Sequence, residues 1–303
     1  ESTGSWAGRH FETDDAIIFV GACGIAVRSI APYVASKKSD PAVLVIDECG
    51  KFVISLLSGH LGGANELTLE VAELLGAVPV VTTATDLHHR FAVDVFAKKN
   101  CCGIQNMKAA KEVSAALLAG EPVGFYSEFP WTGKLPEGLE ESSEDTQDKP
   151  EIGIAVTIHQ TCKPFTSTVQ IIPRVVTLGM GCRRNKEADV IEKEASVCLA
   201  DADIYSQAVE KLTSISIKKD EVGLQKLAED WRIPFITFEE EELSHAEGEF
   251  TPSEFVKKIT GVNNVCERSA VLGAEQGRLI KNKTGRNGVT TALALRNWEV
   301  HFE

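Results

Sequence analysis

Several features that mark common classes of protein are missing from this sequence. No apolar run reaches the roughly 18–20 residues needed to cross a bilayer, so we expect no membrane partner. The eight cysteines show no C-x-x-C spacing, which disfavours a zinc ribbon or a thioredoxin-like motif. Residues Glu1–His10 contain no signal peptide. We therefore expect a cytoplasmic protein with reduced thiols.

Basic charge is also scarce, because 31 Lys and Arg stand against 44 Asp and Glu and give a net charge of −13. A sequence-independent nucleic-acid binder needs excess positive charge, so we expect no nucleic-acid partner. The two common nucleotide fingerprints are absent too. Gly179-Met180-Gly181 begins like a dinucleotide turn, but Arg184 stands where the third glycine belongs. A nucleotide-dependent oxidoreductase is therefore disfavoured.

The most informative stretch present is Ile54–Leu67, which reads as a strand, a glycine loop and a helix. The apolar run Ile54–Leu57 predicts a buried strand. Beyond the loop, a helix is predicted whose apolar face consists of Leu67, Val71, Leu74 and Leu75. Glycines between a strand and a helix allow a ligand to approach backbone N–H groups closely. This arrangement indicates a site for an anionic ligand.

Candidate site residues lie in and beside this loop. His60 and Glu66 could supply acid–base chemistry, and binding is expected from Ser58, Gly59, Gly62, Gly63 and Asn65. Simpler roles stay open for each group. The glycines could only form a turn, His60 could cap a backbone group, and Glu66 could be a first-turn carboxylate favoured by the helix dipole.

Two further segments offer candidates. A strand predicted at 78–81 runs into Thr83, Thr85 and Asp86, and the carboxyl ends of strands are where open α/β sheets bind ligands. Arg28 lies in a helix that follows a glycine turn. The alternatives are that Thr85 and Asp86 cap a turn and that Arg28 is an ordinary surface charge.

The alternation of strands and helices predicts an α/β protein with largely parallel sheets. We expect an N-terminal domain over 1–100, a small middle region over 101–172 with an exposed, mobile acidic loop at 127–150, and a separate C-terminal domain over 173–303. Glu1–Asp15 is expected to be a polar surface segment. In the C-terminal domain, Asn185 is the expected N-cap of a helix that follows a strand at 175–178.

Several blocks of the sequence resemble one known family. Ser55–Leu67 (SLLSGHLGGANEL) is similar to the signature of the CbiG family, the cobalt-precorrin-5A hydrolases of anaerobic cobalamin biosynthesis. Other blocks resemble the family in the same order, and they lie at Phe19–Pro32, Lys37–Glu48, Pro79–Asp86, Leu178–Asp189 and Ser214–Glu221. The resemblance covers nearly the whole chain. It also implies an additional strand and helix before Glu1.

The resemblance implies a substrate and a reaction. The substrate is a cobalt tetrapyrrole that carries many carboxylates, and the reaction opens its lactone with water and releases acetaldehyde. We expect Arg183 or Arg184 to clamp a carboxylate, since arginine binds carboxylates through two parallel hydrogen bonds. Arg28 and the pairs Lys37-Lys38 and Lys218-Lys219 are further positive groups.

For catalysis, the amides of Gly62 and Gly63 could stabilise the oxyanion, and His60 could act as the base. Glu66 or Asp86 could orient the imidazole or act in its place. We expect no protein-bound metal and no cofactor, because cobalt enters with the substrate. A homodimer and contact with methyltransferases of the pathway are further partners that we consider. The alternative function is a non-catalytic carrier of tetrapyrrole intermediates.

Overall fold

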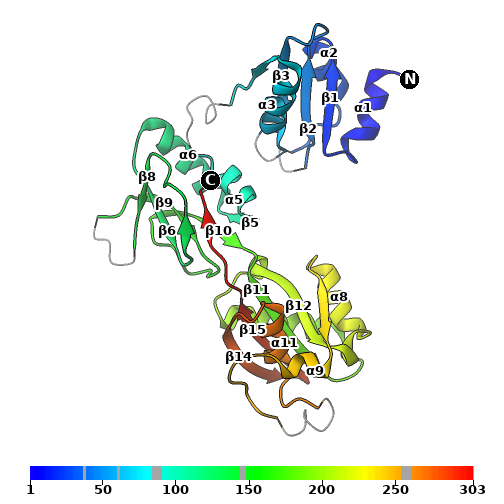
Figure 1. Cartoon of the computed structure of the whole chain (residues 1–303), viewed down its shortest axis with the longest axis vertical. Helices are drawn as coiled ribbons and strands as arrows, with labels where there is room; N and C mark the ends of the chain where they lie inside the picture. The colour runs from blue at the N-terminus through cyan, green and yellow to red at the C-terminus, as the bar shows by residue number, and fades with distance from the viewer. Residues whose placement is uncertain (37–38, 60–61, 84–90, 144–147, 254–260, 303) are drawn as a thin grey trace. The chain divides into compact units, whose positions relative to one another are not determined.

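The computed structural model describes residues 1–36, 39–59, 62–83, 91–143, 148–253 and 261–302 (Figure 1). The chain divides into two compact units. The N-terminal unit holds residues 1–99, 111–122 and 136–138, and the C-terminal unit holds 100–110, 123–135 and 139–303. Both units contain strands and helices, and most strand pairs in the described residues are parallel, which confirms the predicted α/β class.

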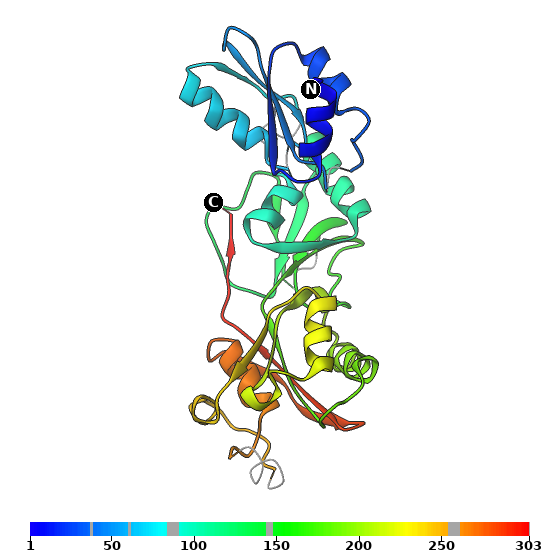
Figure 2. The same cartoon turned by 90° about the vertical axis from the view of Figure 1, so that its right-hand side faces the viewer.

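The N-terminal unit is built on a sheet with the strand order β1-β2-β3-β4. Strands β2 and β3 form an antiparallel hairpin, while β1 runs parallel to β2 and β4 parallel to β3. Alternate residues of β2 point to opposite faces, so Val43 and Val45 pack under α1 and α2, whereas Ala42 and Leu44 pack under α3 (Figure 2). The elements are α1 (Thr3–Phe11), β1 (Ala16–Val20), α2 (Cys23–Ile30), β2 (Ala42–Ile46), β3 (Phe52–Leu57), α3 (Ala64–Leu75), β4 (Val78–Val80) and α5 (Val93–Lys99).

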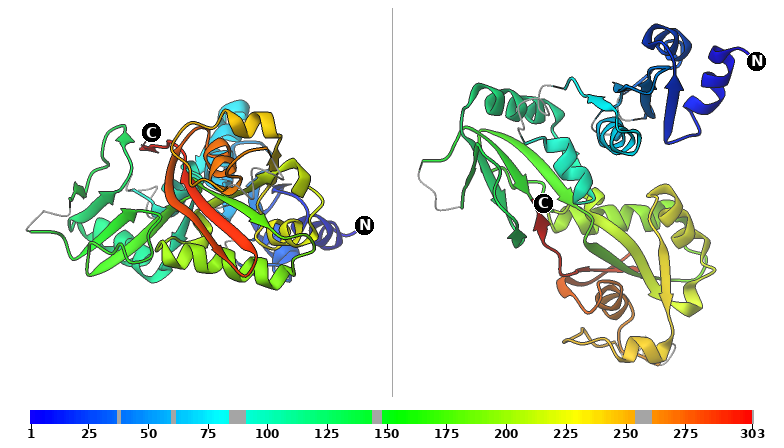
Figure 3. Two further views of the ribbon diagram at one scale, coloured as in Figure 1. Left: turned by 90° about the horizontal axis from the view of Figure 1, so that it is seen from below. Right: turned by 45° about the horizontal axis from the view of Figure 1, so that its top comes forward.

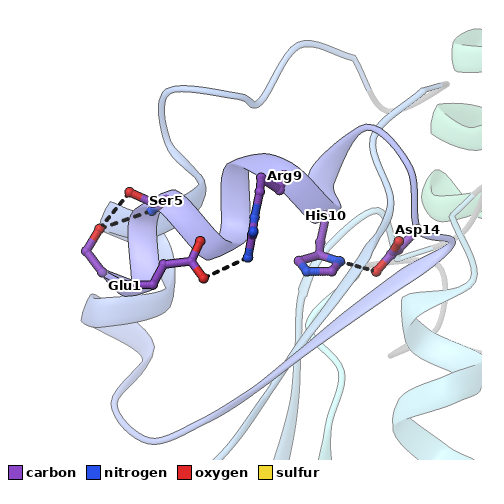
Figure 4. A network of polar contacts seen from close by, with 6 residues as sticks. Glu1, Ser5, Arg9, His10 and Asp14 are labelled. Carbon is purple, nitrogen blue, oxygen red and sulfur yellow. Dashed lines mark hydrogen bonds and ion pairs between the residues drawn. The ribbon is translucent and has the colours of Figure 1, made fainter.

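The polar N-terminal segment, expected to lie at the surface, contains helix α1, of which only Ala7 and Phe11 are buried. Ser2 caps α1 by accepting a hydrogen bond from the Ser5 amide at 3.2 Å. Figure 4 shows the ion pair between Arg9 and Glu1 and the hydrogen bond between His10 and Asp14. The bonded atoms are 2.7 Å and 2.8 Å apart. The buried side carries apolar residues of α1 against the sheet. The polar composition of this segment therefore belongs to the solvent face of an amphipathic helix.

Helix α3 forms where the sequence predicts a helix but buries a different face. Gly76 terminates it in the left-handed conformation, with φ of 64°. Leu67 and Val71 pack on the sheet, but Leu74 and Leu75 are 85% and 52% exposed. The buried stripe consists of small or polar residues, namely Ala64, Asn65, Thr68 and Ala72. Small residues four apart let α3 lie close to the strands, and this turns Leu74 and Leu75 outward.

The central sheet has the strand order β5-β10-β9-β6-β8 and belongs to the C-terminal unit. The segment expected as a mobile acidic loop contributes two strands, so the loop prediction was wrong for its described part. Strand β8 pairs with β6, and β7 pairs with β16 near the end of the chain. Phe129 and Leu139 are buried, and this burial anchors a segment whose acidic side chains face solvent. The elements are β5 (Cys102–Gln105), α6 (Met107–Ala119), β6 (Val123–Ser127), β7 (Trp131–Thr132), β8 (Leu139–Glu141), β9 (Ile152–Val156), β10 (Ser167–Pro173) and β16 (Val300–His301).

The third sheet has the strand order β13-β12-β11-β15-β14. Strands β11, β12 and β13 are parallel, and the antiparallel hairpin of β14 and β15 completes the sheet beside β11 (Figure 3). The elements are β11 (Val176–Cys182), α7 (Ala188–Asp201), η1 (Ser206–Ala208), β12 (Val209–Ile215), η2 (Ser216–Lys218), α8 (Val222–Asp230), β13 (Phe235–Phe238), α9 (Glu240–Ser244), α11 (Cys266–Gly273), β14 (Arg278–Arg286) and β15 (Val289–Leu295).

Two local features of this sheet differ from the sequence predictions. The strand expected at 175–178 continues to Cys182, so Gly179 and Gly181 lie inside β11. A Cβ at Gly179 would collide with the carbonyl of Cys266, so glycine is needed because α11 packs directly on the strand. Asn185 does not cap α7, whose N-cap is Glu187, and instead forms a turn with a positive φ of 55°. None of the described helices is long and apolar enough to cross a membrane.

Candidate active site

The signature loop, Ser58–Gly63, connects β3 to α3 and lies at the carboxyl end of its strand. Its own carbonyls take up the first amides of the helix. Ala64 N–H donates to Ser58 at 3.1 Å, and Asn65 N–H donates to Gly59 at 2.9 Å. Among the described residues, the amides of Gly62, Gly63 and Glu66 have no hydrogen-bond acceptor, so these are the amides available at this helix N-terminus. The role of the Gly62 and Gly63 amides toward an oxyanion stays a prediction.

The loop needs glycine for steric reasons that differ at each position. A Cβ at Gly62 would lie 2.8 Å from the carbonyl oxygen of Ser58, and one at Gly59 would lie 2.7 Å from Oδ1 of Asn65. Gly63 has a φ of 83°, in the left-handed region that favours glycine. Ser58 itself has a φ of 58°, and its hydroxyl donates to the carbonyl of Asp40 at 3.0 Å. The hydroxyl of Ser58 thus fixes the start of the loop to the backbone at Asp40.

Asn65 is buried and ties three segments together. Its Oδ1 accepts a hydrogen bond from the Ser55 hydroxyl at 2.6 Å, and its Nδ2 donates to the Thr83 hydroxyl at 2.9 Å. The sequence had assigned Asn65 and Thr83 to substrate binding. Their side chains bond each other, so their clearest role is to fix the loop relative to the segment that follows β4.

Lys98 is a residue near the loop that sequence reasoning missed. It lies on α5 and is exposed, and a Cβ at Gly63 would be 3.4 Å from its Nζ. Its ammonium therefore lies beside the helix end that would receive an anion. No sequence motif marks Lys98, because only the fold brings α5 next to the loop.

The other candidates of this unit differ in what the structure says of them. His60, Thr85 and Asp86 lie outside the described residues, so their roles stay predictions. Glu66 is exposed in the first turn of α3, where a carboxylate is favoured by the helix dipole. Arg28 donates to the carbonyl of Gly24 at 3.2 Å within α2, and the structure gives it no contact with the described part of the signature loop.

Arg183 and Arg184 line a cavity of about 640 Å³ in the C-terminal unit, which we call the basic pocket. It lies at the carboxyl ends of β11 and β12 and is closed on one side by the β14–β15 hairpin. Five basic side chains line it, and the described lining contains no carboxylate. These residues are Arg183, Arg184, Lys218, Lys283 and Arg286. The predicted arginines thus lie in a positively charged cavity, although in a turn before α7 and not at its first residues.

The hairpin residues were not identified from the sequence, although a signal was present. Asn287 and Gly288 both have a positive φ, of 50° and 78°, and connect β14 to β15 in two residues. Asn-Gly between two strands is a strong hairpin signal. Following it would have placed Lys283 and Arg286 on a strand beside Arg183, whose amide donates to Gly288 at 2.9 Å.

Lys218 is a largely buried cation of the pocket. Its side chain is 11% exposed, and it pairs with Glu221 at 2.8 Å. Burial raises the pKa of Glu221, but the hydrogen bond and charge of Lys218 outweigh it, so the pKa lies below its ordinary value. Burial also raises the pKa of the Cys182 thiol to about 11 and that of Cys266 to about 12. Both thiols are therefore protonated at neutral pH, and neither is an activated nucleophile.

A larger cavity of about 1130 Å³ lies where the central sheet meets the third sheet in the C-terminal unit. Its lining mixes positive and negative groups, among them Arg278, Lys281, Glu128 and Glu299. Because the basic pocket has no carboxylate in its described lining, it suits a polyanion better despite its smaller volume. Among the residues that the structure describes, no group of three His, Cys, Asp or Glu is placed to hold a metal ion.

Comparison with known proteins gives a consistent result along the chain. Residues 5–86 match the family model of the cobalamin synthesis G N-terminal domain, 91–173 that of the cobalamin biosynthesis central region, and 176–294 that of the cobalamin synthesis G C-terminus. The chain is 38% identical over 296 residues to the cobalt-precorrin-5A hydrolase of Salmonella typhimurium, covering 94% of this chain and 83% of that protein. The chain belongs to the CbiG family.

A second relative supports membership of the same family. The cobalt-precorrin-5A hydrolase of Priestia megaterium is 36% identical over 299 residues, which cover 93% of this chain and 79% of that protein. A crystal structure of a cobalamin biosynthesis protein G homologue from Sulfolobus solfataricus aligns over 95% of this chain and 84% of that chain, with 23% identity and a TM-score of 0.39. The three family models and the two relatives of 38% and 36% identity confirm the family resemblance stated from the sequence.

Proposed function

We propose that this protein is a cobalt-precorrin-5A hydrolase of cobalamin biosynthesis. The observation that supports this most directly is the identity of 38% and 36% to two cobalt-precorrin-5A hydrolases over 94% and 93% of the chain. The enzyme opens the lactone of cobalt-precorrin-5A with water and releases acetaldehyde, which gives cobalt-precorrin-5B. The alternative of a non-catalytic carrier has no comparable support.

The signature loop is the proposed reaction centre. A lactone carbonyl attacked by water develops negative charge on its oxygen, and preorganised amides stabilise that charge best. The amides of Gly62 and Gly63 lie at the N-terminus of α3, beside the ammonium of Lys98. Collapse of the intermediate breaks the acyl C–O bond and leaves a carboxylate and a hydroxyl group.

Acid–base chemistry is assigned to His60, with Glu66 and Asp86 as the two carboxylates that could orient it or replace it. A base must remove a proton from the attacking water, and an acid must protonate the departing alkoxide. Histidine titrates near neutral pH and can do both in turn. Glu66 lies in the first turn of α3, next to the loop that carries His60.

The second step needs only a base. Removal of the hydroxyl proton lets the adjacent carbon–carbon bond break, so that acetaldehyde leaves and the electron pair passes to the macrocycle, which then accepts a proton. No oxidant or reductant is consumed. We therefore propose that the enzyme uses no cofactor of its own and that cobalt enters only as part of the substrate.

Substrate binding is assigned to Arg183 and Arg184, with contributions from Arg28, Ser58, Gly59 and the Thr83–Thr85 segment. Five basic groups around one cavity of an acidic chain support carboxylate binding there. A cytoplasmic location is supported by the eight cysteines, all of which are free thiols. A homodimer and contact with methyltransferases of the pathway remain predictions for chromatography and pull-down experiments.

The deciding experiment is incubation of the purified protein with cobalt-precorrin-5A under anaerobic conditions. Acetaldehyde is trapped and quantified, and the mass of the remaining macrocycle is measured. A hydrolase releases acetaldehyde in proportion to substrate consumed. A carrier would bind the substrate and release none, and that result would reject the proposal.

A further inference from the structure

The basic pocket contrasts with the composition of the chain around it. The sequence carries 44 acidic against 31 basic residues, yet the described lining of this cavity has five basic side chains and no acidic one. We propose that the pocket binds one carboxylate-bearing edge of a large apolar ring, and that Lys283 and Arg286 of the β14–β15 hairpin are binding residues there. This inference rests on the proposed function for the identity of the ring.

The charges of the pocket are only partly neutralised by the protein. Lys218 pairs with Glu221 at 2.8 Å, and Arg286 pairs with Asp201 at 3.3 Å. Arg183, Arg184 and Lys283 form no ion pair with any residue in the described ranges. Within the described residues, these three cations of the turn and the hairpin therefore line the cavity without a carboxylate partner. A ligand that carries several separated carboxylates would supply the missing negative charges.

The wall between these cations is apolar. Ile215 and Val265 are buried, and Ile217 is 58% exposed at the pocket. The thiols of Cys182 and Cys266 add neutral surface, because burial keeps both protonated. A single inorganic phosphate would leave this wall in water. A flat organic ring with charged substituents at its edge would cover the wall and reach cations on several elements at once.

The structure holds Lys283 in place through a buried carboxylate. Glu267 is fully buried, and its Oε1 accepts the backbone amide of Lys283 at 2.6 Å and the Thr251 hydroxyl at 2.8 Å. Its Oε2 accepts from Thr251 N–H at 2.6 Å and from Asn264 at 2.7 Å. Four hydrogen bonds therefore join α11, β14 and the segment before α11 on one side of the pocket. A site whose backbone is already fixed loses less entropy when a ligand binds.

The tip of the hairpin is fixed separately. Asn287 Nδ2 donates to Glu194 Oε1 at 2.7 Å, and Glu194 is 7% exposed on α7. This bond positions Arg286 and Gly288, and the stem of Arg183 packs on Gly288. The cations of the hairpin and those of the turn before α7 are thus held as one group.

The test uses the full chain and a stable probe, cobyrinic acid in its dicyano form, which presents free carboxylates around a corrin ring. The methyl ester of the same compound serves as the uncharged comparison. Binding is followed by absorbance or calorimetry for wild type, Lys283→Gln and the control Lys226→Gln. Lys226 is exposed on α8, pairs with Asp230 at 3.1 Å and does not line the pocket. The Lys283 backbone amide still reaches Glu267 in the variant, so the fold is retained.

We expect wild type and Lys226→Gln to bind the acid more tightly than the ester. Added salt should weaken the binding of the acid and leave the binding of the ester unchanged. Lys283→Gln should bind the acid about tenfold more weakly or worse, with little change for the ester. Arg286→Gln should act in the same direction. Equal binding of acid by wild type and both variants would overturn the proposal. Equal competition of the acid by inorganic phosphate would also overturn it, because the site would then recognise a single anion.

Failure of this inference differs from failure of the proposed function. If wild type releases acetaldehyde but both variants keep the KM of wild type, the proposed binding role of the pocket is rejected and the proposed hydrolase function is retained. If wild type binds the acid through Lys283 but releases no acetaldehyde from cobalt-precorrin-5A, the binding role of the pocket is retained and the hydrolase function is rejected.

Discussion

Asn65 donates a hydrogen bond of 2.9 Å to Thr83, and the two residues lie eighteen positions apart. The same side chain accepts a hydrogen bond from Ser55 on β3. One buried amide thus fixes the start of α3 against β3 and against the segment after β4. Because a Cβ at Gly59 would lie 2.7 Å from Oδ1 of Asn65, the loop passes directly beside this side chain, and its shape depends on this bond.

We expect Asn65→Ala to lower the free energy of unfolding by about 1–3 kcal/mol, since two hydroxyls lose their buried partner. Turnover should fall as well, because the loop amides lose their support. Denaturant unfolding and acetaldehyde release would measure the two effects. Full stability and full activity in the variant would show that the amide does not hold the loop.

Alanine substitutions at two glycines test whether the signature loop requires glycine. Gly62→Ala should abolish most of the activity, because the added Cβ would lie 2.8 Å from the Ser58 carbonyl oxygen. Gly4→Ala in α1 is the matched control, since nothing lies within 4 Å of its Cβ and alanine favours a helix by about 0.5–1 kcal/mol. The account is contradicted if Gly62→Ala is as active and as stable as Gly4→Ala.

Lys98 should contribute to the rate through its charge beside Gly63. We expect Lys98→Met to lower kcat by roughly tenfold, less than the loss of a buried oxyanion donor, because Lys98 is exposed to solvent. Lys99→Met is the control, as the neighbouring exposed lysine of α5. Equal kcat values for the two variants would remove Lys98 from the site.

The Lys218–Glu221 pair predicts a dependence of stability on pH. The pKa of Glu221 in the folded protein lies below its ordinary value of 4.5, so the folded state favours the charged carboxylate. Its stabilising effect should be complete above about pH 4.5 and should be lost as the pH falls through the lower pKa of the folded state.

Glu221→Gln should therefore be about 1.5–3 kcal/mol less stable than wild type near neutral pH. The difference should shrink toward about pH 3, where wild type loses the same charge. Denaturant unfolding at several pH values measures this difference in the free energy of unfolding. A difference that stays constant or grows in acid would contradict the assigned direction of the pKa shift.

The sequence predicted the parts of the fold that depend on local pattern. The strands expected at 54–57 and 78–81 lie in β3 and β4, and the helix expected after the glycine loop is α3. It failed where packing overrides pattern. Leu74 and Leu75 face solvent because small residues of α3 bring the helix close to the sheet, and Gly179 lies in a strand because α11 needs room.

The candidate site divides in the same way. Glycines, His60 and Glu66 are adjacent in the sequence, so the loop could be found from spacing. Lys98, Lys283 and Arg286 are placed at their sites by the folding of α5 and of the β14–β15 hairpin. The residues next to them in the sequence form no motif that indicates a functional role. Only the Asn287-Gly288 turn offered a signal for the hairpin.

The central claim is that the signature loop carries the chemistry of the hydrolase. It is tested most directly by the rates of lactone opening and acetaldehyde release for wild type, His60→Ala and Glu66→Gln, together with substrate affinity. If His60 is the base, His60→Ala should lower turnover by about 10²–10⁴-fold while binding is largely kept. Glu66→Gln should cost less if Glu66 orients the imidazole, and as much if it is the base. Full rates of both steps in both variants would contradict the claim, leave the loop as a binding element, and move the catalytic assignment to Asp86.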